Sequence, residues 1–359
     1  MKKSLLIAAA SAIILAGCAE SDTFKPIEEI PIGFTKVHIE NVTKAITPGA
    51  YTTENFEAEG NTFGVFGYKN TNTQTSALIF NNQKVEYQSG LSTANGYNAT
   101  TDWAYTPIKY WDKSATSYNF YAYAPHDGDF TGTVALSSNS QNAFTITGFE
   151  QANTQDNMID LMTDLTSKQS VTGSNIGQND VAFTFGHILS NINLVMAVSQ
   201  SLKADETDNP VRVESVKIGT IKLDGDYAYA TNAYSWTLKT GSRTAEFNAT
   251  QTSGNVFASK ALKASNDGFT NVPALTDLLF VPQNVDAGYK ITIKYFIGNE
   301  QFDKEILLSE FKNGNNTLAT WAPGNKYTYQ LIIGPNPILF DITGVSDWAN
   351  GGTYTYTIE

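Results

Sequence analysis

The chain has 359 residues, with 23 lysines and arginines against 35 aspartates and glutamates, for a formal net charge of −12 at pH 7. An acidic chain lacks the basic patches that hold a polyanion, so we expect no nucleic acid partner. The length is too great for one small core and suits two domains. Abundant Tyr, Phe, Thr and Asn are typical of strands and turns.

The first residues have the order of a secretory signal. Two lysines precede an apolar run over residues 5–15, which is too short to span a bilayer as a stable helix. The run leads into LAGC, which resembles the bacterial lipobox and ends at Cys18, the chain's only cysteine. This resemblance implies removal of residues 1–17 and acylation of Cys18, which would bind outer-membrane lipid. An ordinary signal peptide with a chance cysteine is the alternative.

Residues 18–29 form an acidic linker. Glu20, Asp22, Glu28 and Glu29 lie in it. Acidic residues just after a lipidated cysteine resemble the surface-export signals of Bacteroides-type lipoproteins. We therefore expect an outer-membrane lipoprotein, and the face of that membrane stays open.

Apolar and polar residues alternate over several later segments. The clearest runs cover residues 118–124, 188–198, 291–297 and 327–333. Period-two alternation is what a strand with one buried face requires, and no comparably long segment has helical spacing. The sequence therefore predicts an all-β chain made of sandwiches. The polar segment 201–210 divides it into an N-terminal sandwich, 45–202, and a C-terminal sandwich, 203–359.

Residues for catalysis or metal binding are scarce. His38, His126 and His187 are isolated, and none has a second histidine or cysteine at the spacing of metal ligands. The acidic segments HDGDF and LDGDY only partly match a calcium loop, so we interpret both as turns. We predict no catalytic residue, no metal site and no cofactor.

An aromatic segment allows two interpretations. Trp103, Tyr105, Tyr110 and Trp111 could stack on sugars or pack in a core. Regularly spaced aromatic residues usually pack, so a buried core is the favoured interpretation.

Several segments together resemble the fimbrillin family, the Mfa-like pilins of Bacteroides-type bacteria. The segment TDWAYTPIKYWDKSATSYNFYAYAP covers residues 101–125. Further matches are FGVFGY at 63–68, VAFTFGHILSNINLVM at 181–196, and the end segments APGNKYTYQLII and FDITGVSDW. The resemblance implies two tandem transthyretin-like β-sandwich domains in a lipoprotein precursor that is exported, trimmed and polymerised into fimbriae.

The same resemblance implies a removable N-terminal strand. In the family, this strand fills a groove of its own subunit until a protease cuts after a basic residue, usually arginine. Here the propeptide would be residues 30–44, with Ile32 and Phe34 pointing inward and cleavage between Lys44 and Ala45. The matching position carries lysine, so either the protease accepts lysine or this chain stays uncut with Lys44 in a solvated loop.

The strand donated to a neighbouring subunit is expected near the C-terminus. TYTYTIE, residues 353–359, places Tyr354, Tyr356 and Ile358 on one face of a strand. Such a strand could enter a neighbour's groove or complete its own sandwich. The segment NPILFDITGVSDW is a second candidate.

These observations predict a fimbrial subunit or fimbria-associated lipoprotein without enzymatic activity. Other fimbrial subunits would be its partners through β-strand exchange, and ligands on host or bacterial surfaces are further expected partners. A surface glycan-binding lipoprotein is the alternative, and a glycoside hydrolase is a more distant one. The sequence leaves open a role as shaft, tip or anchor.

Overall fold

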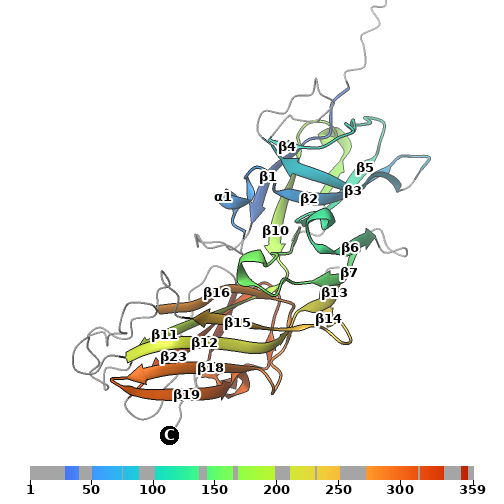
Figure 1. Ribbon diagram of the computed structural model, residues 1–359. Helices are drawn as coiled ribbons and strands as arrows, with labels where there is room; N and C mark the ends of the chain where they lie inside the picture. Colours follow the sequence, from blue (N-terminus) through green and yellow to red (C-terminus); the bar gives the residue numbers. More distant parts are fainter. Residues whose placement is uncertain are drawn as a thin grey trace, which may run out of the picture.

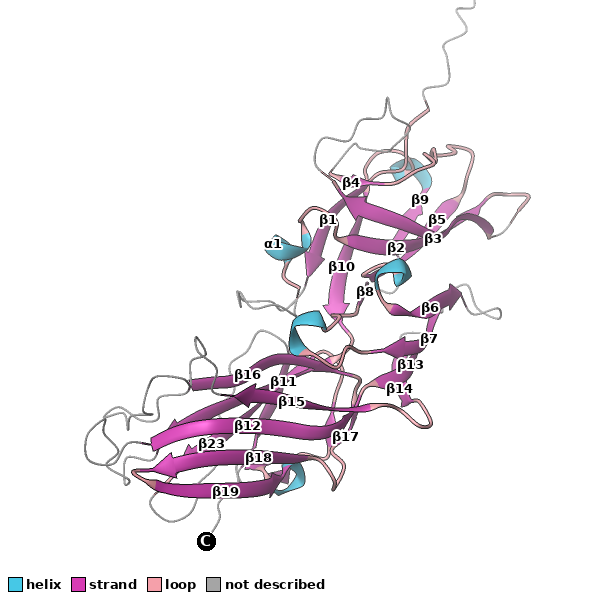
Figure 2. Ribbon diagram, in the orientation of Figure 1, coloured by secondary structure: helices cyan, strands magenta, loops and turns pink. Residues whose placement is uncertain are grey.

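The computed structural model describes residues 29–39, 51–74, 76–88, 102–136, 144–164, 169–198, 211–230, 233–250, 272–313, 316–334 and 349–354. Within these ranges the elements are strands, apart from the four-residue helix α1 (Thr53–Phe56) and short 3-10 turns. The predicted all-β class is confirmed. Figures 1 and 2 show an elongated molecule with two lobes, which we name the N-terminal and C-terminal lobes.

The N-terminal lobe is an eight-stranded sheet. Its strands have the order β1-β10-β8-β5-β2-β3-β4, and β9 also pairs with β5. The bounds are β1 (Phe34–Ile39), β2 (Thr62–Asn70), β3 (Ala77–Tyr87), β4 (Trp103–Ala104), β5 (Ser117–Ala124), β8 (Met162–Asp164), β9 (Gln169–Thr172) and β10 (Val181–His187). The β1–β10 pair is parallel, whereas the other pairs of this sheet are antiparallel. The sheet packs around a core rich in aromatic side chains.

The C-terminal lobe is a sandwich of two four-stranded sheets. One sheet has the order β16-β11-β23-β24 and the other β15-β12-β18-β19. Their bounds are β11 (Ser190–Val198), β12 (Val211–Lys222), β15 (Thr244–Thr250), β16 (Val272–Phe280), β18 (Lys290–Ile297), β19 (Glu300–Leu307), β23 (Asn325–Ile333) and β24 (Ala349–Tyr354). Two small pairs accompany them, β17 (Gln283–Asn284) with β22 (Thr320–Trp321) and β20 (Lys312–Asn313) with β21 (Asn316–Thr317). Valine, isoleucine and leucine side chains from both sheets fill the space between them.

A fourth sheet joins the lobes. It has the order β14-β13-β7-β6, with β6 (Thr131–Leu136), β7 (Phe144–Glu150), β13 (Asp224–Ala230) and β14 (Ala233–Leu238). Strands from the two halves of the chain meet where β7 pairs antiparallel with β13. This sheet lies between the two lobes in Figure 2.

Strand pairing bears on how the chain divides. Strand β11 pairs with β16 and β23, so the described C-terminal lobe starts at Ser190. The predicted division between residues 202 and 203 lies outside the described residues and stays a prediction. Among the residues that the structure describes, no helix is long and apolar enough to cross a membrane.

Strand β5 is buried on both faces over its second half. Tyr118, Phe120 and Ala122 contribute to the aromatic core of the N-terminal lobe. Tyr121 and Tyr123, on the opposite face, belong to the cluster that continues into the C-terminal lobe. The alternating pattern predicted one buried face, whereas a cluster that includes Val134 on β6 and Ile146 on β7 buries the second.

Candidate functional site

The N-terminal segment closes the aromatic core of its lobe. Ile32, Phe34, Val37 and Ile39 are all at most 2% exposed. The first two and the last two differ in parity, because β1 bulges against β10: Thr35 pairs with Ala182, but His38 pairs with Thr184. Sequence reasoning identified Ile32 and Phe34 as inward-pointing residues and missed Val37 and Ile39. The change of apolar parity after Thr35 was the available signal.

The Phe34 ring occupies the centre of this core. Its centroid lies 5.5–6.3 Å from the centroids of five other aromatic rings, which is within the range of favourable aromatic pairs. These rings belong to Phe63, Phe80, Tyr105, Phe120 and Phe183. Four strands and Tyr105, which follows β4, therefore form one aromatic groove around a single side chain of the N-terminal segment.

Backbone hydrogen bonds hold the segment on two sides. On one side it pairs with β10, and Val181 N donates to Gly33 O at 2.8 Å just before that pairing. On the other side Ile32 N donates to Lys109 O at 2.8 Å, and Trp111 N donates to Ile30 O at 2.9 Å. The buried Tyr105 hydroxyl also donates to Ile32 O at 2.7 Å. The segment thus lies like an added strand between β10 and the 109–111 loop.

We give the name clamp to residues 109–118, which include the 109–111 loop and the turn after Trp111. The turn holds the loop in place. Asp112 accepts hydrogen bonds from the hydroxyl and backbone N–H of Ser114 and from Lys69 Nζ at 2.9 Å. These bonds, led by the Ser114 hydroxyl, lower the pKa of Asp112 to about 2. Tyr118 Oη accepts from Asp112 N at 2.7 Å. The clamp therefore depends on an ionised carboxylate.

Several predicted site residues lie outside the described residues. Cys18, Lys44, Ala45, Tyr356 and Ile358 are among them. Tyr354 ends β24, whose backbone runs parallel to β23 in a pairing that includes Asn325 with Ala349 and Tyr329 with Tyr354. Strand β24 is the last strand in its sheet order. Two parallel terminal strands thus lie at sheet ends, β1 in the N-terminal lobe and β24 in the C-terminal lobe.

The histidines have structural surroundings. His187 Nδ1 lies 2.9 Å from the carboxylate of the buried Asp160, which also accepts from Tyr51 N at 2.8 Å. Burial, together with the charge of Asp160, raises the pKa of Tyr51 to about 12. His126 caps the 3-10 turn Asp127–Asp129, and His38 is exposed. Within the described ranges, no three His, Cys, Asp or Glu side chains gather as metal ligands.

The segment HDGDF forms a turn, as predicted, whereas the same prediction for LDGDY is wrong, because its residues from Asp224 onward belong to strand β13. Asp127 accepts from Asn82 Nδ2 at 2.9 Å and from Val134 N at 3.3 Å. Asp129 accepts a short hydrogen bond from the hydroxyl of Thr62. Protein donors therefore satisfy both carboxylates.

Aromatic side chains of the 103–111 segment lie in the core. Trp103, Tyr105 and Trp111 are at most 7% exposed, and Tyr110 is 44% exposed. Three of the four residues that could have stacked on sugars are therefore buried, so the segment offers no flat platform of exposed rings.

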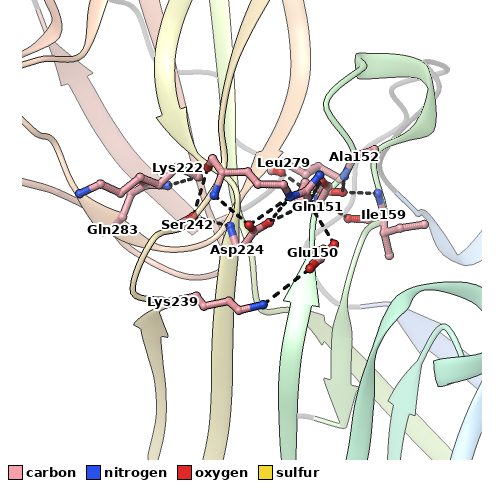
Figure 3. Close-up of polar contacts among 11 residues, drawn as sticks. Glu150, Gln151, Ala152, Ile159, Lys222, Asp224, Lys239, Ser242, Leu279 and Gln283 are labelled. Atoms are coloured by element: carbon pink, nitrogen blue, oxygen red, sulfur yellow. Dashed lines mark hydrogen bonds and ion pairs between the residues drawn. The ribbon is translucent and has the colours of Figure 1, made fainter.

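A polar network fixes the junction between the lobes (Figure 3). The buried Asp224 accepts hydrogen bonds from the backbone N–H of Arg243 at 2.9 Å, from its Nη2 at 2.7 Å and from its Nε at 3.1 and 3.2 Å. Arg243 Nη2 also donates to Gln151 O at 3.1 Å. The fully buried Gln151 side chain donates to Ile159 O and to Leu279 O on β16 at 2.8 and 2.9 Å. The network joins the end of β7 to β13 and β16, so it opposes bending between the lobes.

Comparison with known proteins places the chain in a family. Residues 43–348 match the family described as fimbrillin-like. Fimbrium subunit Fim1C of Phocaeicola vulgatus is 28% identical over 396 aligned positions, which cover 99% of each protein. The crystal structure of a fimbrial protein from Bacteroides vulgatus is 20% identical, with a TM-score of 0.55 over 88% of this chain and 99% of that one, so the two share a fold. Because the family match spans most of its length, this chain belongs to the fimbrillin-like family.

Proposed function

We propose that this protein is a structural subunit of a surface fimbrium, without enzymatic activity, that polymerises by strand exchange. Cleavage between Lys44 and Ala45 would release residues 30–44, and a strand of the next subunit would fill the vacated groove. The observation that carries this proposal is that Ile32 and Phe34, which lie on an N-terminal segment added to a sheet edge, are at most 1% exposed.

Loss of the N-terminal segment would leave unpaired backbone groups and exposed aromatic rings, which a strand of another subunit could cover. The 109–111 loop and the edge of β10 would regain unpaired backbone groups, above a floor of aromatic rings. An exposed strand edge with an apolar floor is a template for pairing with another chain. Strand addition at such an edge gains main-chain hydrogen bonds and fills side-chain pockets at alternate positions.

The C-terminal segment 349–359 is the proposed donor. Its described part, β24, runs parallel to β23, and the segment it would replace runs parallel to β10. The donated strand would therefore pair in parallel both in its own subunit and in the groove of a neighbour. Tyr354, Tyr356 and Ile358 alternate with threonines, which supplies the apolar side chains that the groove requires.

Two variants of the full chain test this proposal. The acceptor variant lacks residues 349–359 and carries an engineered protease site across residues 43–46. The donor variant keeps its C-terminus and stays uncut. Cleaving the acceptor and releasing its plug in the presence of the donor should give a heterodimer in size-exclusion chromatography, whereas the uncut acceptor should stay monomeric.

A matched donor variant makes the test specific. Tyr356→Asp would place a charge where an apolar pocket is expected, so it should lower heterodimer formation at least tenfold. Equal dimerisation by this variant, or by a donor that lacks residues 349–359, would refute the C-terminal donor.

The proposed anchor is an acylated Cys18 at the outer membrane. Several acyl chains give durable attachment, because each buried methylene contributes about 0.8 kcal/mol. Cys18→Ser should therefore move the protein from the membrane fraction to the soluble fraction, as measured by immunoblotting. Retention of Cys18→Ser in the membrane would contradict the lipid anchor.

A further inference from the structure

Four polar side chains form a buried cluster in the C-terminal lobe, which we name the Asn191 cluster. They are Asn191 and Asn193 on β11, Asp277 on β16 and Lys326 on β23. Asn191, Asn193 and Asp277 are at most 4% exposed, and the Lys326 side chain is 21% exposed. Neighbours Ile192 and Leu194 belong to the sandwich core, so Asn191 and Asn193 lie on the opposite face of the sheet. The proposed strand exchange uses none of the four.

The register brings an amine and a primary amide together. Asn191 pairs directly with Lys326 across the parallel β11–β23 ladder, so both side chains leave the same face of neighbouring strands. Asn191 Nδ2 donates to Asp277 Oδ1 at 2.8 Å, and Lys326 Nζ lies 3.3 Å from that same oxygen. One carboxylate therefore contacts both the amine of Lys326 and the amide nitrogen of Asn191.

A second amide polarises the first. Asn193 Nδ2 donates to Asn191 Oδ1 at 2.6 Å, which draws electron density from the Asn191 carbonyl carbon. Asn193 is itself held by Asp277 N, which donates to its Oδ1 at 3.0 Å. The carbonyl of Asn191 thus has a positioned donor of the kind that stabilises a tetrahedral oxyanion.

The backbone at Asp277 supports a functional interpretation. Asp277 has a φ of +51°, in the left-handed region that is unfavourable for residues other than glycine, and it lies at a register shift between β11 and β16. Strained positions of this kind persist where surrounding contacts hold them, and they concentrate at functional sites. Here the strained residue supplies the carboxylate that contacts both reacting groups.

We infer that Lys326 and Asn191 form an intramolecular isopeptide bond, with Asp277 as the proton-transfer group. Asp277 accepts a proton from the Lys326 ammonium, and the free amine attacks the Asn191 carbonyl carbon. A C–N bond to Lys326 Nζ forms, the C–N bond to Asn191 Nδ2 breaks, and Asp277 passes the proton to the departing nitrogen. One ammonia leaves as ammonium with the second ammonium proton, so no oxidant, reductant or cofactor takes part.

The bond would lie on the path of tension through the subunit. Strand β11 enters the C-terminal lobe directly after β10, and β23 is the strand that carries β24. Covalent linkage of β11 to β23 would connect the proposed acceptor groove to the proposed donor strand without relying on ladder hydrogen bonds alone. This consequence rests on the proposed function, but the bond itself does not.

Mass spectrometry of the folded full chain tests the inference without any assay of polymerisation. The intact mass should fall below the sequence mass by one ammonia. A tryptic digest should contain residues 169–203 joined to residues 313–359, because a linked Lys326 resists cleavage. Recovery of residues 313–326 as a free peptide in full yield, deamidated Asn191, or a link to another lysine would overturn the inference.

Variants separate the reaction from a merely structural cluster. Lys326→Arg keeps a cation beside Asp277 but removes the nucleophile, so the intact mass of this variant should equal its sequence mass, without loss of ammonia. Asp277→Asn should lower the linked fraction at least tenfold. Lys290→Arg is the matched control, since Lys290 pairs with Glu305 at 2.7 Å on the exposed face of the other sheet and should leave the linkage unchanged. Full linkage in Asp277→Asn would refute the role of Asp277.

Discussion

The two lobes are stabilised by different kinds of core. The N-terminal core consists mainly of aromatic rings gathered around Phe34, the first residue of β1. The C-terminal core consists mainly of aliphatic residues on long strands, such as Ile218 and Ile293. An aromatic side chain buries about 150–250 Å². A few contacts of a short segment can therefore close the first core, whereas closure of the second core is spread over many strands.

The two lobes also differ in how their strands are paired. Strand β1 pairs with one strand, β10, and its extension over residues 30–32 contacts the clamp. Strand β12 pairs with both β15 and β18 over most of its length. Because β1 is the first strand in its sheet order, the N-terminal segment can leave without breaking the other strand pairs of that sheet. This difference supports the proposed removal of residues 30–44, whereas removal of β12 would break strand pairs on both of its sides.

The substitution Phe34→Ala should have the largest effect, and it should destabilise the N-terminal lobe selectively. Truncating a fully buried phenylalanine costs about 3–5 kcal/mol. Because the lost contacts all lie in the N-terminal lobe, hydrogen exchange should accelerate in β10 and in the 109–111 loop before it accelerates in β12 or β18.

The matched control is Ile293→Ala in the second core, where the expected cost is about 2–5 kcal/mol. Ile293 is fully buried on β18. If Phe34→Ala and Ile293→Ala gave the same exchange pattern across both lobes, the cores would unfold as one unit and the comparison would fail.

The substitution Arg243→Ala tests whether the junction couples the lobes. Asp224 would stay buried and lose the guanidinium bonds, while Arg243 itself is 46% exposed, so the expected cost is about 2 kcal/mol. We expect the denaturant transitions of the two lobes to separate, followed by tryptophan fluorescence of single-tryptophan variants that keep Trp103 or Trp321.

The chain's other arginine provides the control. Arg212 lies over the Phe296 ring at 5.1 Å on an exposed surface, so Arg212→Ala should cost about 0.5–1 kcal/mol and leave the transitions together. Separation by Arg212→Ala as well would assign the effect to lost charge rather than to the Asp224 network.

Alternation along the sequence predicted the all-β class because a half-buried strand imposes a period of two. The pattern could not predict the second buried face of β5 at Tyr121 and Tyr123, because residues of another sheet complete the cluster to which they belong. The family resemblance implied that Ile32 and Phe34 point inward, but it did not reveal the bulge that turns Val37 inward. The Asp224–Arg243 and Asn191 clusters join residues far apart in sequence, so only the strand register reveals them.

The smallest expected effect is a pH dependence of the contact between the clamp and the N-terminal segment. The pKa of Asp112 lies at about 2 in the folded chain, below its ordinary value of 3.8. A lowered carboxyl pKa adds stability above the unfolded value, and this stability is lost as pH falls through the folded value. Between about pH 4 and pH 2, the clamp should therefore release Ile30 and Ile32 faster, as measured by hydrogen exchange at the amides of Ile32 and Trp111.

The readout must be local, because the C-terminal lobe has its own carboxyl with a lowered pKa. Gly288 N donates to Asp286 and lowers its pKa, so global acid unfolding reports on both lobes. Asp112→Asn, which keeps the size of the side chain, should remove the pH dependence at Trp111 and leave that of the Asp286 turn intact. A clamp that stays pH-dependent in Asp112→Asn would show that a group other than Asp112 governs its opening.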